Sequence, residues 1–240
     1  IHGDPIRNIN WKATAKRGER VKPLVNEYEV EGKKCAWIFL DASCEFVRGK
    51  SNDKIFDNCI EAADIFTYLF IDKDFLVGMY IYDSSDNERN LFYPERGIKH
   101  YNNISKNLLR LTPGNGSDGE GLSKAVEMCR NFLYRYNPLP IVITNINMTD
   151  QRSLRNGIGK LKSLIGGRRV KNVPLIVLNV LSYPKNKGND LYWQNTRKIN
   201  QMERYSVTEY IKRSGGHLIE WNPREEKIYA AMKEVLNYEI

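Results

Sequence analysis

Apolar residues along the chain follow two alternating patterns. Short apolar runs, bounded by turn residues, recur at 35–40, 75–82, 139–146 and 173–181. Their length and their β-branched or aromatic content are typical of strands buried on both faces of a parallel sheet. Between these runs, apolar residues return every three or four positions, as on one face of a helix that lies on a sheet. This second pattern is clearest at 56–70, 122–133 and 154–165.

Three further segments complete the predicted elements. Residues 217–221 predict a last strand, and Asn222-Pro223-Arg224-Glu225 follows it. Asparagine is favoured as a helix N-cap, proline at the first helical position and glutamate at the third, so this tetrapeptide predicts the start of a C-terminal helix. Residues 89–94 follow a turn-rich segment and predict an antiparallel hairpin partner of strand 75–82. Residues 20–31 predict an extended edge strand ahead of the first core strand.

The repeated alternation of strands and helices predicts the fold class. We expect an α/β domain with a doubly wound, mostly parallel sheet, one antiparallel edge and helices on both faces. A chain of 240 residues fits one domain with a sizeable core. With 41% hydrophobic and 11% aromatic residues, the chain is too apolar for a disordered protein. No apolar run approaches the roughly 18 residues that would span a bilayer.

Cysteine and histidine usage excludes several kinds of site. The four cysteines contain no Cys-x-x-Cys pair, and their apolar surroundings predict buried thiols in a reducing compartment. Only three histidines are present, and none belongs to a His-Glu-x-x-His motif, which excludes histidine-rich metal sites.

The net charge is basic, with 37 Lys and Arg against 29 Asp and Glu, or +8. Such an excess favours polyanions. The basic residues are scattered, however, apart from short clusters at 12–22 and 168–171, and no zinc-finger or RNA-binding aromatic motif accompanies them. A solvated basic surface is the favoured interpretation, and a basic nucleic-acid-binding domain is an alternative.

Candidate chemistry lies where predicted strands end, because ligands of open α/β sheets gather at the carboxyl ends of the strands. The first core strand runs into Asp41-Ala42-Ser43-Cys44-Glu45, which places two oxygen-bearing side chains on one loop. Hard cations such as Mg²⁺ take oxygen ligands of this kind. Two other segments are candidates to complete such a site. They are the loop 114–119, which contains Ser117 and Asp118, and the pair Thr144-Asn145.

Each of these segments also has a purely structural interpretation. Asp41 and Ser43 are residue types that cap loops after strands. Ser117 stands three residues before Glu120, the spacing of a helix capping box. Asn145 is a common turn residue.

The start of the chain resembles the signature of the domain of unknown function 58 family. That signature contains a Gly-Asp, an Arg, an Ile-x-Trp and an Ala, matched by Gly3-Asp4, Arg7, Ile9-Asn10-Trp11 and an alanine at 13 or 15. The similarity continues in the Glu-x-Glu of 27–29, in the Asp-x-Ser of 41–43, and in the Gly-Gly-His-Leu-Ile-Glu-Trp-Asn-Pro of 215–223. It therefore spans essentially the whole chain.

The family is regarded as a relative of the von Willebrand factor A domain, so the resemblance implies a metal-ion-dependent adhesion site. Such a site uses Asp-x-Ser-x-Ser, a threonine from a second loop and an aspartate from a third. Asp41 and Ser43 match, whereas Glu45 replaces the second serine and Asn145 replaces the third-loop aspartate. The second-loop threonine aligns with Ser117, with Asp118 as the alternative. The resemblance thus implies a degenerate site for Mg²⁺ or Mn²⁺.

The same resemblance implies a non-enzymatic protein–protein interaction module that docks a partner at Asp41, Ser43 and Asp118. Family members often carry two transmembrane helices upstream and neighbour MoxR-type AAA ATPases. This context implies a soluble part, tethered through segments before Ile1 to the cytoplasmic face of the cell membrane, that works with such an ATPase. The expected domains are 1–33, the signature and edge strand, and 34–240, the von Willebrand factor A-like unit.

An enzyme is the main alternative of another class. A Mg²⁺-dependent phosphohydrolase or nuclease would use Asp41, because haloacid-dehalogenase-like enzymes also place a nucleophilic aspartate after the first strand. They need a second acid two residues later, where this chain has Ser43. A nuclease needs converging carboxylates, but Asp72 and Asp74 are expected at the opposite end of the sheet.

Overall fold

The structure is a computed structural model that describes residues 34–43, 55–84, 90–114, 121–147, 149–165, 175–181 and 191–236. The chain divides between Lys33 and Lys34, and all described residues belong to the second unit, Lys34–Ile240. The opening signature and the predicted edge strand at 20–31 lie outside the described residues.

A six-stranded sheet forms the centre of this unit, with the strand order β3-β2-β1-β4-β5-β6. Strand β3 is antiparallel to β2, and all the other neighbouring pairs are parallel. The predicted doubly wound, mostly parallel sheet with one antiparallel edge is therefore confirmed. The strands are β1 (Cys35–Asp41), β2 (Leu76–Tyr82), β3 (Leu91–Glu95), β4 (Leu139–Thr144), β5 (Leu175–Val180) and β6 (Gly216–Trp221).

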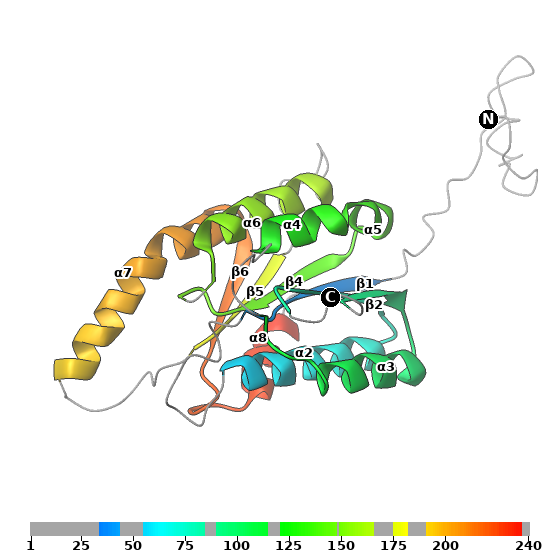
Figure 1. Cartoon of the computed structure of the whole chain (residues 1–240), viewed down its shortest axis with the longest axis horizontal. Helices are drawn as coiled ribbons and strands as arrows, with labels where there is room; N and C mark the ends of the chain where they lie inside the picture. The colour runs from blue at the N-terminus through cyan, green and yellow to red at the C-terminus, as the bar shows by residue number, and fades with distance from the viewer. Residues whose placement is uncertain are drawn as a thin grey trace, which may run out of the picture. The chain divides into compact units, whose positions relative to one another are not determined.

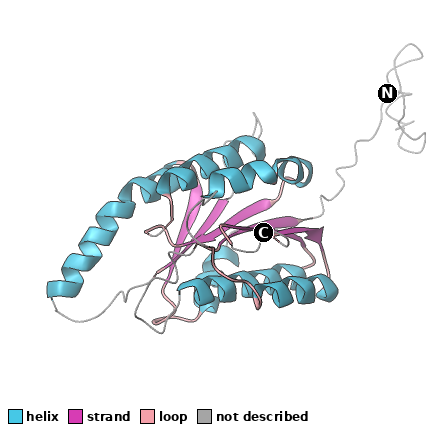
Figure 2. Cartoon of the chain, viewed as in Figure 1, coloured by secondary structure: helices cyan, strands magenta, loops and turns pink. Residues whose placement is uncertain are grey.

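Helices cover both faces of the sheet (Figure 1). One layer contains α2 (Ile55–Asp72), α3 (Ile98–Leu108) and α8 (Ile228–Leu236). The other layer contains α4 (Gly121–Met128), α5 (Arg130–Tyr136), α6 (Gln151–Ile165) and α7 (Leu191–Arg213). Figure 2 shows the strands running between these two layers. Among the described residues, every helix is too short or too polar to cross a bilayer.

The core consists of two apolar clusters, one on each face of the sheet. Successive side chains of a strand point to opposite faces, so Ile38 and Leu40 pack with α2, whereas Trp37 and Phe39 pack with α4 and α6. Burial on both faces explains why the strands read as unbroken apolar runs rather than alternating ones. The described cysteines, Cys35, Cys59 and Cys129, are buried free thiols, as predicted; Cys44 lies outside the described residues.

Two predicted helices differ from those observed. The apolar pattern of 122–133 predicts one helix, but the backbone leaves the helical region at Cys129, with φ −89° and ψ 0°, and two helices result. The C-terminal helix begins at Ile228 rather than at Pro223. Asn222 instead organises a turn: its Oδ1 accepts from the Arg224 N–H (3.2 Å), while the Glu226 carbonyl accepts from Trp221 Nε1 (3.0 Å). The asparagine that was predicted to cap a helix therefore stabilises a turn that is hydrogen-bonded to Trp221.

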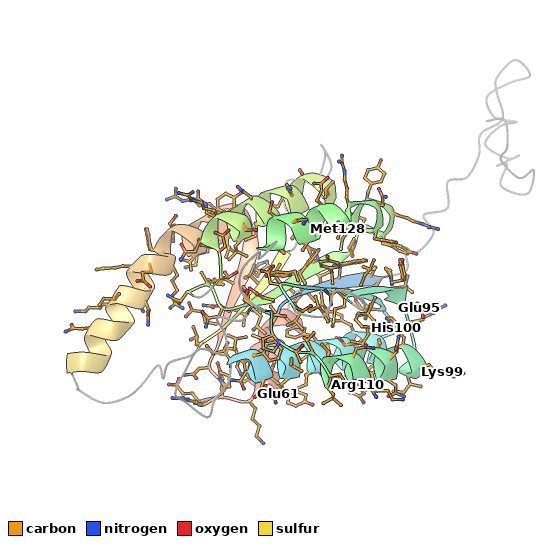
Figure 3. All side chains as sticks on the ribbon, viewed as in Figure 1. Glu61, Glu95, Lys99, His100, Arg110 and Met128 are labelled. Atoms are coloured by element: carbon orange, nitrogen blue, oxygen red, sulfur yellow. The ribbon has the colours of Figure 1, made fainter. Side chains whose placement is uncertain are left out.

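Helices α3 and α7 were not predicted from the sequence. Helix α3 buries only His100, Ile104 and Leu108. It is fastened to the sheet by a polar contact, since His100 Nε2 lies 2.8 Å from the Val77 carbonyl oxygen and Nδ1 lies 3.6 Å from Glu95 Oε2 (Figure 3). A contact made by a histidine does not contribute to the pattern of apolar residues from which helices were predicted.

Candidate functional site

A row of polar side chains crosses the sheet at the carboxyl ends of five strands, on the face covered by α4, α6 and α7. It follows from strand register and alternation. Asp41 pairs with Tyr82, and Thr144 pairs with Asn179, which in turn pairs with Glu220. Leu40 pairs with Ile143, so the next residues, Asp41 and Thr144, are also neighbours. We call these five residues, Tyr82, Asp41, Thr144, Asn179 and Glu220, the polar row.

Asp41 is the centre of the site, and it is completely buried. Its Oδ2 accepts a hydrogen bond from Thr144 Oγ1 at 2.6 Å, across 103 positions of sequence. Its Oδ1 accepts from the Ser43 hydroxyl at 2.7 Å and from the Ser43 backbone N–H at 3.1 Å. Asp41 and Ser43 thus meet as the sequence predicted, and Thr144 completes the coordination of the carboxylate.

Burial dominates the electrostatics of Asp41. Removal from water raises the pKa of its carboxyl above the ordinary value, and hydrogen bonds from Thr144 and Ser43 offset only part of this effect. The nearby charge of Asp83 raises the pKa further. Among the described residues, no basic group compensates the charge of this carboxylate.

Asp83 directly follows β2 and brings a second carboxylate to the same place. Its backbone has φ +58°, an uncommon conformation for a residue other than glycine. Its Oδ1 accepts from the backbone N–H of Gly121, the first residue of α4, at 3.0 Å. Burial raises the pKa of Asp83, and interactions with Gly121 and Ser43 partly offset the rise. The sequence alone did not place Asp83 at this site.

The structure also locates the ends of the predicted second loop. The Gly114 N–H donates to the Ala42 carbonyl at 3.0 Å, and the Gly121 N–H donates to Asp83. Both flanks of the segment 115–120 therefore lie at the carboxyl edge where β1 and β2 end. Ser117, Asp118 and Glu45 lie outside the described residues, so their roles stay predictions.

The third predicted loop supplies Thr144 to Asp41, and the side chain of Asn145 makes other contacts. Asn145 Nδ2 donates to the Val180 carbonyl at 2.7 Å, and its Oδ1 accepts from the Asn147 N–H at 3.0 Å. Thr144 shares the face of Asp41 because side chains alternate along a strand, so a shift of one residue changes the face. That alternation is the signal in the sequence that would have selected Thr144 from the pair.

Two buried polar atoms of the row lack a hydrogen-bond partner within the described part of the chain. They are the Tyr82 hydroxyl and Asn179 Nδ2, in residues that are 2% and 0% exposed. Buried polar groups are satisfied in the great majority of cases, so such atoms mark places where water or an ion completes the structure. At the far end of the row, Glu220 Oε1 lies 2.9 Å from Arg204 Nη1 of α7.

The donor set suits a hard divalent cation. We call Asp41, Ser43, Tyr82, Asp83 and Thr144 the Asp41 cluster; it offers two carboxylates and three hydroxyls, all of them oxygen donors. No group of three His, Cys, Asp or Glu side chains placed to hold a metal occurs among the described residues. Hydroxyls therefore have to contribute if a cation binds, as they do in an Asp-x-Ser site.

A second surface feature lies outside this cluster. A hollow of about 380 Å³ lies between α2 and the end of α3 and has an apolar floor with an acidic rim. Glu61 belongs to this rim, and Figure 3 shows it in the same helical layer as Arg110. The lining residues are Phe56, Asp57, Ile60, Glu61, Asp64, Ser105, Leu108, Leu109 and Leu111.

The strand order and the oxygen-rich carboxyl edge define this unit as a doubly wound α/β domain with a polar site at the carboxyl ends of its strands. The chain belongs to the family described as protein of unknown function DUF58, whose model matches residues 1–187. The predicted family is thereby confirmed. No curated protein matches the sequence.

Solved structures with a similar fold include a membrane protein and a von Willebrand domain. An aerotolerance-related membrane protein from Bacteroides fragilis NCTC 9343, with multiple mutations to serines, matches with a TM-score of 0.51 and 15% identity. The match covers 85% of this chain and 97% of that one. A von Willebrand factor type A from Catenulispora acidiphila matches with a TM-score of 0.47 and 10% identity, over 85% and 41% of the two chains. At 15% identity, the likeness to the first protein shows the fold alone.

Proposed function

We propose that this domain is a non-enzymatic protein-interaction module that docks a partner at the carboxyl edge of its sheet. The observation that carries the proposal is the buried Asp41 carboxylate, held between Ser43 and Thr144. Burying a carboxylate whose partners are two hydroxyls and one backbone N–H, with no basic group among the described residues, is costly. A binding role for Asp41 at this edge explains why a buried carboxylate is present despite its free-energy cost.

The proposed site holds a divalent cation, Mg²⁺ or Mn²⁺. Asp41 and Ser43 would provide oxygen ligands, and the metal would present an open position to a carboxylate of the partner. Glu45, Ser117 or Asp118, and Asn145 complete the ligand set that the family resemblance implies. The two neighbouring carboxylates of the Asp41 cluster support this proposal, because a dication would compensate their charge.

The proposed partner is a MoxR-type AAA ATPase, and the proposed location is the cytoplasmic face of the cell membrane. Both follow from the family resemblance. The tether would be formed by segments outside the given sequence. The net charge of +8 suits a position close to anionic lipid.

The proposal is tested by measuring binding of a MoxR-type ATPase to the immobilised protein, in Mg²⁺ and in EDTA. We expect binding in Mg²⁺, a loss of affinity of about tenfold or more in EDTA, and a similar loss for Asp41→Ala. Asp74→Ala removes an exposed carboxylate from the α2–β2 turn and is the matched control, with unchanged binding. Full binding by Asp41→Ala in EDTA would show that the partner does not use this site.

A phosphohydrolase remains the second candidate, because Asp83 supplies the neighbouring carboxylate that the sequence did not place beside Asp41. Hydrolysis of p-nitrophenyl phosphate and its diester with Mg²⁺ or Mn²⁺ distinguishes the two classes. We expect no turnover. Turnover that Asp41→Ala abolishes would replace the interaction proposal with a catalytic one.

A further inference from the structure

The third-loop position of the site lacks its carboxylate in this chain, and a carboxylate from another strand lies beside Asp41. Asn145 is neutral, and its amide is engaged by Val180 and Asn147. Asp83, by contrast, directly follows β2, the strand that pairs with β1, and its charge acts on Asp41. The negative charge missing at 145 is therefore present at 83.

Capping of α4 accounts for only part of the Asp83 environment. A neutral acceptor would suffice for the 3.0 Å bond from the Gly121 N–H. It would also avoid placing two carboxylates together in a buried region, where like charges repel strongly. Asp83 in addition contacts Ser43, the residue that binds Asp41. The cap therefore explains the position of Asp83 but not its charge.

The Tyr82 hydroxyl is a second, independent observation that favours a cation site beside Asp41. Tyr82 precedes Asp83, is 2% exposed and pairs in register with Asp41. Its hydroxyl lies against Asp41 and Thr144, yet it has no hydrogen bond of good geometry among the described residues. A buried hydroxyl beside Asp41 and Thr144 that lacks a hydrogen bond of good geometry is a group that a cation or its bound water would satisfy.

We propose that Asp83 is the second carboxylate ligand of the divalent cation at Asp41, in place of the residue at 145, with the Tyr82 hydroxyl directed at the cation or its water. The inference rests on the proposed metal-dependent function and assigns its ligands. Two carboxylates with the hydroxyls of Ser43 and Thr144 balance the charge of a dication with oxygen donors only.

The test is a titration of the protein with Mn²⁺, followed by calorimetry and by loss of the free Mn²⁺ electron-paramagnetic-resonance signal. Asp83→Asn is the informative variant, because the amide oxygen can still accept from Gly121 while the charge is lost. Asp150→Asn is its matched control: this carboxylate is an electrostatic neighbour of Asp83, is exposed, and caps α6 through the Arg152 N–H. Melting temperatures in EDTA verify that both variants are folded.

We expect the unmodified protein to bind one Mn²⁺ and Asp41→Asn to abolish binding. Asp83→Asn should weaken binding about tenfold or more, and Asp150→Asn less than about threefold. If Asp41→Asn abolishes binding while Asp83→Asn behaves like Asp150→Asn, the assignment of Asp83 is wrong and the metal site stands. If the unmodified protein binds no Mn²⁺, both the assignment and the proposed metal site are wrong.

Discussion

Individual residues at the end of β1 carry more charge than their surroundings compensate. Asp41 is completely buried, and its partners are hydroxyls and one backbone N–H rather than a basic group. In the folded state its carboxyl therefore holds a proton more tightly than it does in the unfolded chain. Stability must then depend on pH through this one residue.

The sign of that dependence is fixed by the direction of the shift. Because the pKa of Asp41 is raised above 3.8, its contribution favours folding at low pH and is lost as pH rises from about 4 through the folded-state pKa. Asp41→Asn cannot ionise. As pH rises, the free energy of unfolding of this variant should therefore increase relative to that of the unmodified protein, by at most about 1.4 kcal/mol per pH unit. Urea denaturation in EDTA between pH 4 and 7.5 measures this difference. A difference that is independent of pH would contradict the expectation.

At the scale of elements, a glycine of α6 allows the close packing of α6 against α4. Both Gly157 and Gly159 lie within α6, and the helix runs through them without a break. A Cβ at Gly157 would meet Leu122 Cγ at 2.6 Å and the Leu122 backbone carbon at 3.0 Å. A Cβ at Gly159 would meet only the Tyr210 hydroxyl, at 3.1 Å. The first glycine is required by packing, and the second is not.

The two glycines therefore predict opposite effects of one substitution. Gly157→Ala should lower the free energy of unfolding by about 1–3 kcal/mol, because α4 must move away. Gly159→Ala should raise it by up to about 1 kcal/mol, because alanine favours the helix and the Tyr210 hydroxyl can shift. Urea denaturation of both variants at pH 7 provides the comparison, with each serving as the control of the other. Equal effects would show that α4 and α6 are not packed as observed.

At the scale of the whole molecule, 37 basic residues are interspersed with 29 acidic ones along the chain. Helix α2, for example, contributes Asp57, Glu61 and Asp64 to one acidic rim. A net charge of +8 distributed in this way attracts polyanions weakly and without geometric selection.

Filter binding with duplex and single-stranded DNA tests this expectation. We expect weak binding at low salt that is equal for both forms and is lost between about 50 and 200 mM salt, because nonspecific binding arises from counterion release. Binding that persists at about 200 mM, or that prefers one form, would support the nucleic-acid alternative.

The pattern of the sequence was sufficient for the sheet and for part of the site. Buried parallel strands impose unbroken apolar runs, and each run ended within a few residues of the observed strand. Asp41 and Ser43 were predicted as a pair because they are close in sequence and follow a strand directly. The helices α3 and α7 were missed; the apolar side chains that α3 buries are Ile104 and Leu108 alone.

What the sequence by itself determined is the six strands of the sheet and the loop that bears Asp41, because both depend on local spacing and side-chain type. The tertiary structure alone decided which residues from other strands meet that loop. Thr144 reaches Asp41 because strand register places it on the same face, whereas Asn145 binds the end of β5. Asp83 joins the cluster because β2 pairs with β1. Alternation along a strand gives the face of each side chain, but the order in which the strands pair is set by the packing of the whole sheet.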